Sequence, residues 1–87
     1  MLIDFAKIEL MDLEGNISYI DLSKVFGNLV FKSTTDVAEF DLAKKIYYEG
    51  AVELNKDQAG GLLRYVDSFQ TILVRESIKK VLSDINN

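Results

Sequence analysis

The sequence predicts an α+β fold in which an N-terminal β-hairpin, with or without a third short strand, packs against three to four α-helices. Two observations predict it. Apolar and polar residues alternate near the N-terminus, which is typical of strands, and the later chain carries apolar residues at helical spacing behind good capping residues. With 87 residues, no proline and no repeat, nothing indicates an internal linker. We therefore expect a single small domain over residues 1–87.

The first expected element is the β-hairpin. Its first strand is predicted over Ile3–Met11, where apolar and charged residues alternate from Ala6 to Leu10. Turn-forming residues occupy Asp12–Asn16, with Gly15 suited to a positive φ, and a second β-prone run covers Ile17–Ile20.

A first helix is expected to start at Leu22, with Asp21 as its cap. Gly27 and Asn28 lower its helix propensity, so a break near Phe26 is an alternative. The helix has the spacing of a buried stripe, made by Leu22, Val25, Phe26, Leu29 and Val30.

The second helix is predicted over Asp36–Glu49, because Asp36 and Glu39 have capping-box spacing and Gly50 supplies a stop. Glu39 alone interrupts its broad apolar side, and we expect its side chain to reach solvent at the edge. Val37 and Tyr48 fall on the opposite side, where they are predicted to form a small exposed apolar patch.

The run Ala51–Leu54 fits a third short strand added to the hairpin, and Asn55 with Gln58 caps the next helix. Gly60 and Gly61 fall on the polar side of that helix, bracketing Arg64 on the helical wheel. Two interpretations stay open: either another backbone approaches closely there, as where a partner helix crosses, or the two glycines form a turn before a late or bent helix start.

The last helix is expected over Phe69–Ile85, with apolar residues on two sides. Because a helix with two apolar sides is suited to two neighbours, part of this surface is predicted to contact a partner. A narrow seam comprises Val74, Ile78, Val81, Leu82 and Ile85, and the opposite side of the first turns comprises Phe69, Ile72 and Leu73.

Histidine and cysteine are absent, and 48% of the residues are apolar. Without histidine and cysteine, the chain lacks the usual acid/base group near neutral pH, a preferred zinc ligand and the thiolate nucleophile. We therefore expect no catalytic residues, no metal and no cofactor. The high apolar content leaves more apolar surface than a small core readily covers, so some of it is expected to face another chain.

Ten basic and fourteen acidic residues give a net charge of −4, and the acidic excess lies before Leu22. Because an acidic chain repels phosphate backbones, a nucleic-acid partner is not favoured. The N-terminus lacks the pattern of a signal peptide, and no apolar run approaches the roughly 20 residues that span a bilayer. We expect a cytoplasmic location and no membrane partner.

Two motifs resemble catalytic or metal-binding patterns without completing them. Ser77 and Lys80 match Ser-x-x-Lys, in which a lysine activates a serine, but Ser77 falls on the charged side of a helix. Glu76 and Lys80 fit a surface ion pair better. Asp12 opens a run of alternating oxygen ligands, yet the last position of a calcium loop would be Ser23 instead of a carboxylate.

The run GNLVFKSTTDVAEFDLAKKIYYEGAVELNKDQAGGLL, residues 27–63, resembles a class of short proteins of unknown function encoded in phages and integrated mobile elements of gut bacteria. In that class the hairpin, the Gly-Asn-Leu segment, the Thr-Asp helix start and a Val-x-Leu before the third helix recur in this order. The likeness covers Ile8 to Val66. It implies a mobile-element context and a role in assembly or regulation through protein contacts, and it assigns no functional residues.

Together these patterns predict a non-catalytic protein–protein interaction module that binds a protein partner and itself as a homo-oligomer. The first alternative is an acidic regulator that binds a DNA-binding protein or DNA, and the second is an enzyme that uses only carboxylates, tyrosine or lysine. The residues expected to contact partners are Val37, Tyr48, Gly60, Gly61, Arg64, Phe69 and Leu73.

Overall fold

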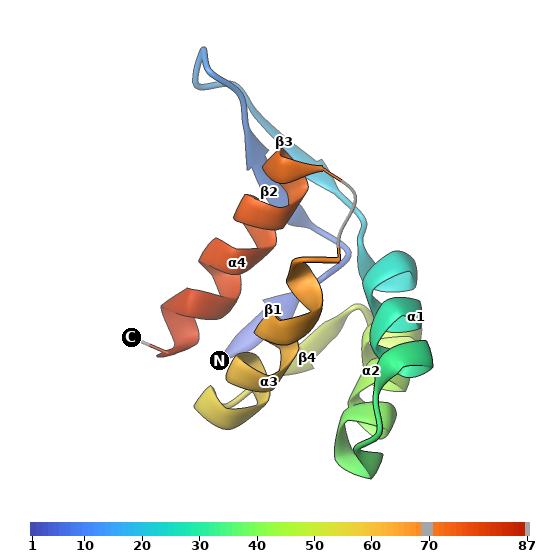
Figure 1. The fold of residues 1–87 in the computed structure, drawn as a ribbon. Coiled ribbons are helices and arrows are strands. Elements are labelled where there is room, and N and C mark those ends of the chain that lie inside the picture. The colour runs from blue at the N-terminus through green and yellow to red at the C-terminus, as the bar shows by residue number, and fades with distance from the viewer. Residues whose placement is uncertain (69–70, 87) are drawn as a thin grey trace.

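The computed structural model describes residues 1–68 and 71–86, and within them it confirms the α+β fold, with four helices. Helices α1 and α2 lie side by side on one side of the molecule and α4 lies on the other, while the β2–β3 hairpin projects beyond the helices (Figure 1). The elements in chain order are β1 (Leu2–Asp4), β2 (Ile8–Met11), β3 (Ile17–Ile20), α1 (Ser23–Ser33), α2 (Val37–Glu49), β4 (Ala51–Glu53), α3 (Lys56–Val66) and α4 (Ile72–Asn86).

The predicted hairpin is confirmed as the antiparallel pair β2–β3, in which Ile8 lies opposite Ile20. Its turn is fixed by Asp12, whose Oδ1 accepts hydrogen bonds of 2.9 Å from the backbone N–H groups of Glu14 and Asn16. Gly15 has a φ of +86°, as its place in the turn predicts.

The prediction of one strand over Ile3–Met11 was wrong. Asp4 ends β1 because its Oδ1 accepts a hydrogen bond from the backbone N–H of Ala6 and its carbonyl accepts one from that of Lys7. The resulting turn directs Phe5 into the core, where it is fully buried. The chain therefore changes direction before β2 begins.

The third strand exists but does not extend the hairpin. β4 pairs antiparallel with β1, with Val52 opposite Ile3, and forms a separate two-stranded sheet. As predicted, Val52 and Leu54 are buried and Glu53 is exposed.

Helix α1 begins at Ser23, one residue later than predicted, and runs to Ser33 without a break. Its N-cap is Leu22 and not the predicted Asp21, but Asp21 still contacts the helix start, since its Oδ1 accepts from the backbone N–H and the hydroxyl of Ser23. Val25 was placed in the buried stripe but is 44% exposed. The buried face is turned towards Gly27 instead, because α2 packs against that glycine.

Helices α2 and α3 follow the predicted caps, whereas α4 begins at Ile72 and not at the predicted Phe69, because Thr71 lies outside the helix and its Oγ1 accepts a hydrogen bond from the backbone N–H of Val74. Asp36 caps α2 through the backbone N–H of Ala38, and Asn55 and Gln58 form the predicted capping box of α3. The seam of α4 packs on the core, with Val74, Ile78 and Leu82 buried and Val81 and Ile85 partly buried.

One cluster of buried residues joins both sheets to all four helices, and the rings of Phe5 and Phe26 stack within it at a centroid distance of 5.4 Å. Among the helices in the described part of the chain, none is long and apolar enough to cross a bilayer.

Candidate functional site

Helices α1 and α2 cross at Gly27, which is buried. A Cβ atom at this position would lie 3.0 Å from Tyr47 Cβ and 3.1 Å from the carbonyl oxygen of Ala43. Glycine therefore permits an approach that any larger residue would prevent, because the atoms it meets belong to the α2 backbone or are attached directly to it.

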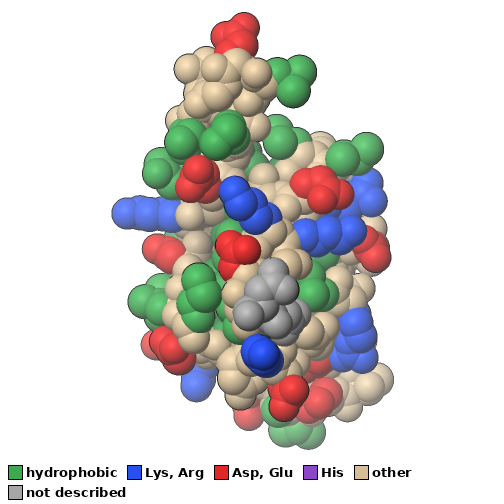
Figure 2. Space-filling view, turned by 90° about the vertical axis from the view of Figure 1, so that its left-hand side faces the viewer, with side chains coloured by type: hydrophobic (Ala, Val, Ile, Leu, Met, Phe, Trp, Pro, Cys, Tyr) green, Lys and Arg blue, Asp and Glu red, His purple; other side chains and the backbone are tan. Residues whose placement is uncertain are grey.

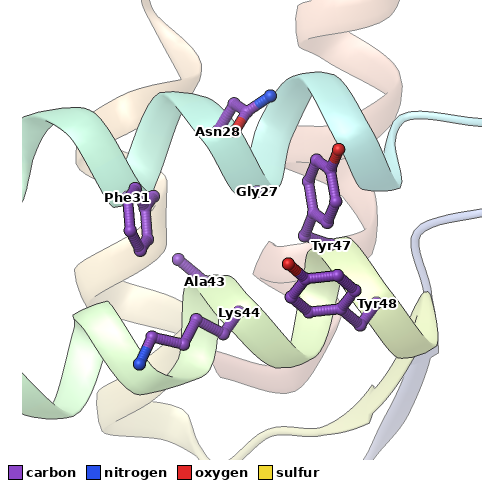
Figure 3. A pocket seen from close by; sticks show the side chains of 7 residues that line it. All are labelled: Gly27, Asn28, Phe31, Ala43, Lys44, Tyr47 and Tyr48. Carbon is purple, nitrogen blue, oxygen red and sulfur yellow. The ribbon is translucent and has the colours of Figure 1, made fainter.

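Beside this crossing the two helices leave an open groove of about 280 Å³. We call it the α1–α2 groove, and its lining residues are Gly27, Asn28, Phe31, Ala43, Lys44, Tyr47 and Tyr48. Figure 3 shows Phe31 near one end, the two tyrosines near the other, and Gly27 and Ala43 between them. The groove thus has a small-residue centre between aromatic side chains.

The aromatic side chains of the groove are held by ring contacts. Phe31 stacks on Phe40 at a centroid distance of 4.3 Å, and Tyr47 contacts Tyr48 edge to face at 4.9 Å. Even so, Tyr48 is 77% exposed. Because these rings are already positioned, a ligand that binds between them loses little side-chain entropy in the groove.

The charge of the groove is opposite to that of the whole chain. Of the lining residues that the structure describes, Lys44 is the only charged one. Lys24 lies next to the tyrosines, with its Nζ 2.8 Å from the Tyr47 carbonyl oxygen and 4.1 Å from the Tyr47 ring centroid. Lys44 Nζ lies 3.9 Å from Asp41 Oδ1. The groove of an acidic chain therefore has a cationic edge.

These features define what the groove is able to bind. Its volume of about 280 Å³ falls just below the range of roughly 300–1,000 Å³ that is common for small-molecule sites. It accommodates one or two side chains of a polypeptide, and its aromatic lining and lysines favour an apolar side chain next to a carboxylate.

A second constellation surrounds Glu39, which was expected to reach solvent. Instead its side chain is only 14% exposed. Thr34 Oγ1 and the Tyr65 hydroxyl donate to Glu39 Oε1 at 2.8 and 2.6 Å, and Arg64 Nη2 donates to Oε2 at 2.7 Å. We call these four residues the Glu39 cluster. The expectation was wrong because α3 packs over this edge of α2 and supplies two donors.

The pKa values of the Glu39 cluster show which protonation states these contacts favour. Burial raises the pKa of Glu39, but hydrogen bonds from Tyr65, Thr34 and Arg64, with the charge of Arg64, outweigh it and leave the pKa below its ordinary value. Burial, followed by the hydrogen bond to Glu39, raises the pKa of Tyr65. The cluster therefore favours an ionised carboxylate beside a neutral phenol.

The Glu39 cluster also accounts for two predicted contact residues. Arg64 is engaged within its own chain, since it pairs with Glu39 and its Nε donates to the carbonyl oxygen of Gly61 at 3.1 Å. A Cβ atom at Gly61 would lie 2.8 Å from Glu39 Oε2. The close neighbour of Gly61 within its own chain is thus a side chain and not another backbone.

Gly60 and Gly61 both lie inside α3, which excludes the predicted turn. A Cβ atom at Gly60 would meet nothing within 4 Å. Nothing in the structure explains a glycine at position 60.

The other predicted contact residues lie apart from one another. Val37 and Tyr48 are both 77% exposed but occupy opposite ends of α2, about 16 Å apart at 1.5 Å per residue. They do not form one patch, and only Tyr48 lines the groove. Leu73 is exposed on α4 next to Ile72, and Phe69 lies outside the described residues.

Ser77 and Lys80 line a second open groove, between β2 and α4, together with Glu9, Glu76 and Asp84. The Ser77 hydroxyl donates to the Leu73 carbonyl oxygen at 2.8 Å. A serine nucleophile needs its proton directed at a base, so this geometry does not match Ser-x-x-Lys chemistry. Across residues 1–68 and 71–86, no three carboxylates gather closely enough to hold a metal ion.

Sequence reasoning missed most of the groove, including Lys24, Gly27 and Phe31. One signal was present: Gly27 interrupts a helix that is otherwise strongly amphipathic, which is typical of a close helix crossing. No family model, curated protein or solved structure matches this chain. Its function must therefore be inferred from the site.

Proposed function

We propose that this chain is a non-catalytic protein–protein interaction module that self-associates, and that the α1–α2 groove is its binding surface. One observation carries the proposal: aromatic side chains held by ring contacts line an open groove, and Lys44 is its only charged residue among those described. Sites of this composition bind apolar side chains of other polypeptides.

The amount of exposed apolar surface supports the same proposal. Large apolar side chains are exposed both in the groove and on other elements, and association with another polypeptide would bury part of this surface. Within the described residues they are Met1, Leu2, Met11, Leu13, Ile17, Tyr19, Val25, Phe31, Val37, Tyr48, Ile72 and Leu73.

The proposal is tested by measuring the mass of the chain in solution with light scattering, from low to high micromolar concentration. We expect a mass that rises above the 9.8 kDa of one chain. Tyr48→Asp should weaken the association, whereas Val37→Asp should not, because both residues are 77% exposed on α2 but only Tyr48 lines the groove. A monomer at every concentration, or equal effects of both substitutions, would contradict the proposal.

The biological setting is part of the same proposal. The resemblance of residues 27–63 to short proteins of phages and integrated mobile elements supports a role in assembly or regulation through protein contacts. A cytoplasmic location fits that role. Neighbouring genes would test it, because location among head or tail genes and location among repressor genes imply different partners.

A second candidate function is an acidic regulator that binds a DNA-binding protein. The hairpin favours it, since no lysine or arginine occurs between Ile8 and Ser23, where Glu9, Asp12, Glu14 and Asp21 lie. On the face shown in Figure 2, the projecting end carries acidic and hydrophobic side chains. Basic and acidic side chains are interspersed over the rest of this face. Strong weakening by salt of binding to a basic protein would support this function, and indifference to salt would count against it.

The alternative of a carboxylate-only enzyme has less support. Glu39 is the carboxylate whose surroundings differ most from solvent, and both of its oxygens already accept hydrogen bonds from its own chain. This arrangement supports a structural role for Glu39, because a general base needs a free oxygen that faces a substrate.

A further inference from the structure

The hairpin turn, residues 12–16, presents one apolar side chain between two carboxylates. Leu13 is fully exposed, and Asp12 and Glu14 flank it. A leucine that is wholly in water contributes nothing to the core, and its whole side chain is accessible for burial against another molecule.

The hairpin turn is rigid before it meets any partner. The carboxylate of Asp12 accepts from two backbone N–H groups, and the backbone N–H of Asp12 donates to the Asn16 carbonyl oxygen at 3.0 Å. Gly15 N–H donates to the Asp12 carbonyl oxygen at 3.1 Å. Because these bonds fix the backbone on both sides of Leu13, little conformational entropy remains to be lost on binding.

The hairpin turn and the α1–α2 groove are complementary in chemistry. The turn offers an aliphatic side chain with carboxylates on both sides, and the groove offers aromatic rings with Lys24 and Lys44 beside them. The carboxylate of Glu14 has no ion-pair partner among the described residues. Pairing turn with groove would therefore bury apolar surface and bring opposite charges together.

The turn is unable to enter the groove of its own chain. The β2–β3 pairing keeps the hairpin extended, and the hairpin points away from α1 and α2 (Figure 1). The same projection leaves the turn accessible to another molecule. A groove on a second copy is thus the complementary surface that the hairpin is able to reach.

We propose that the α1–α2 groove binds the hairpin turn of a second copy of this chain, with Leu13 between the aromatic side chains and Glu14 facing Lys44. This inference rests on the proposed self-association and identifies its contact. Two different surfaces meet, so each copy contributes both a turn and a groove, and the contact either occurs twice in a closed dimer or repeats along a chain.

The apolar half of the contact is tested by Leu13→Ser in the full chain, with the dissociation constant measured by analytical ultracentrifugation. We expect a roughly tenfold to hundredfold weaker association, as loss of a buried leucine side chain produces. Leu2→Ser is the matched control, since it makes the same change at another exposed leucine that lies outside the turn, the groove and the predicted contact residues, and it should leave the constant unchanged. Equal weakening by both would overturn the proposal in favour of non-specific apolar association.

The charged half is tested by Glu14→Lys and Lys44→Glu. Each single change should weaken association by about twofold to fivefold, the range for exposed ion pairs. The double variant in one chain should recover the wild-type constant, because it restores the pair with reversed charges. If the double variant associates as weakly as the two single effects combined predict, the proposal is overturned.

Mixing two variants distinguishes the proposed turn–groove contact from self-association in general. Leu13→Ser lacks a functional turn and Tyr48→Asp lacks a functional groove, so neither should associate well alone, and an equimolar mixture should form complexes. If Tyr48→Asp abolishes association while Leu13→Ser does not, the groove binds another segment and only the turn proposal fails. If the wild-type chain is monomeric throughout, self-association itself fails.

Discussion

The Tyr65 hydroxyl on α3 donates a 2.6 Å hydrogen bond to Glu39 Oε1 on α2. The same oxygen accepts from Thr34, which directly follows α1, and Arg64 donates to Oε2. One carboxylate therefore connects α2 and α3 to the segment that follows α1. This explains why an acidic residue interrupts the apolar side of α2: its charge is satisfied by donors that only the folded chain brings together.

The contribution of this contact is measurable with Tyr65→Phe. The substitution should lower the free energy of unfolding by about 1.5–3 kcal/mol, as expected for a hydrogen bond to a charged group. Urea denaturation measures the change. Tyr19→Phe, at an exposed tyrosine, serves as the control and should change stability by less than about 0.5 kcal/mol. An equally small effect at Tyr65 would contradict a stabilising role.

The Glu39 cluster also predicts a dependence of stability on pH. The pKa of Glu39 in the folded chain lies below its ordinary value of 4.5, because the hydrogen bonds outweigh the effect of burial. Its contribution is therefore fully present above about pH 4.5 and is lost as pH falls through the folded-state pKa.

Thermal unfolding across acidic pH measures this effect against Glu39→Gln. The variant should lose less stability on acidification than the wild-type chain does. Asp12 and Asp21, whose pKa values are lowered by hydrogen bonds from Asn16 and Ser23, contribute acid sensitivity equally to both chains. Parallel pH profiles for the two chains would show that Glu39 is not linked to folding.

The adjacent glycines of α3 should respond oppositely to alanine. Gly60→Ala should stabilise the chain by roughly 0.5–1 kcal/mol, because helix propensity improves and the added methyl group meets nothing. Gly61→Ala should destabilise it, because the methyl group would meet Oε2 of the Glu39 carboxylate, which hydrogen bonds to both of its oxygens hold in place. In a Glu39→Ala background, Gly61→Ala should become stabilising. Similar effects at both glycines in the native background would contradict this account.

Gly27→Ala tests the helix crossing. The added Cβ would meet atoms of Tyr47 and Ala43 at 3.0–3.1 Å, so α1 and α2 would have to separate. We expect a net loss of up to about 2 kcal/mol, because overpacking costs roughly 1–3 kcal/mol and helix propensity returns about 1. Chemical denaturation measures it, and Asn28→Ala at the next, exposed position should be neutral or slightly stabilising. A stabilised Gly27→Ala chain would show that the helices do not need glycine there.

Short-range features were predictable because neighbouring residues produce them. The hairpin turn around Gly15, the Asn55–Gln58 capping box and the α2 cap at Asp36 involve partners within four positions in the sequence. The strand over Ile3–Met11 failed for a related reason. Alternation covers only Ala6 to Leu10, and the side chain of Asp4 forms a local turn that an alternation pattern does not register.

The candidate groove was mostly unpredictable because its parts lie far apart in the chain. Tyr48 was identified as exposed, yet the opposite wall of the groove comes from α1, about 20 residues earlier. Gly60 and Gly61 were noticed as an anomaly beside Arg64, but the contacts of Gly61 and Arg64 with Glu39 exist only once α3 lies next to α2. Helical spacing tells which side of a helix is apolar, not which other helix it meets.

The amino-acid sequence by itself determined the α+β class, the starts of α2 and α3 and the acidic, apolar hairpin, since these depend on residue type and on contacts within a few positions. Only the tertiary structure decided that β4 pairs with β1, that Glu39 is enclosed by donors and that two lysines stand beside aromatic rings at the α1–α2 crossing. The physical reason is that packing selects one partner for each apolar face from several of similar hydrophobicity, and that selection depends on the shape of the whole chain.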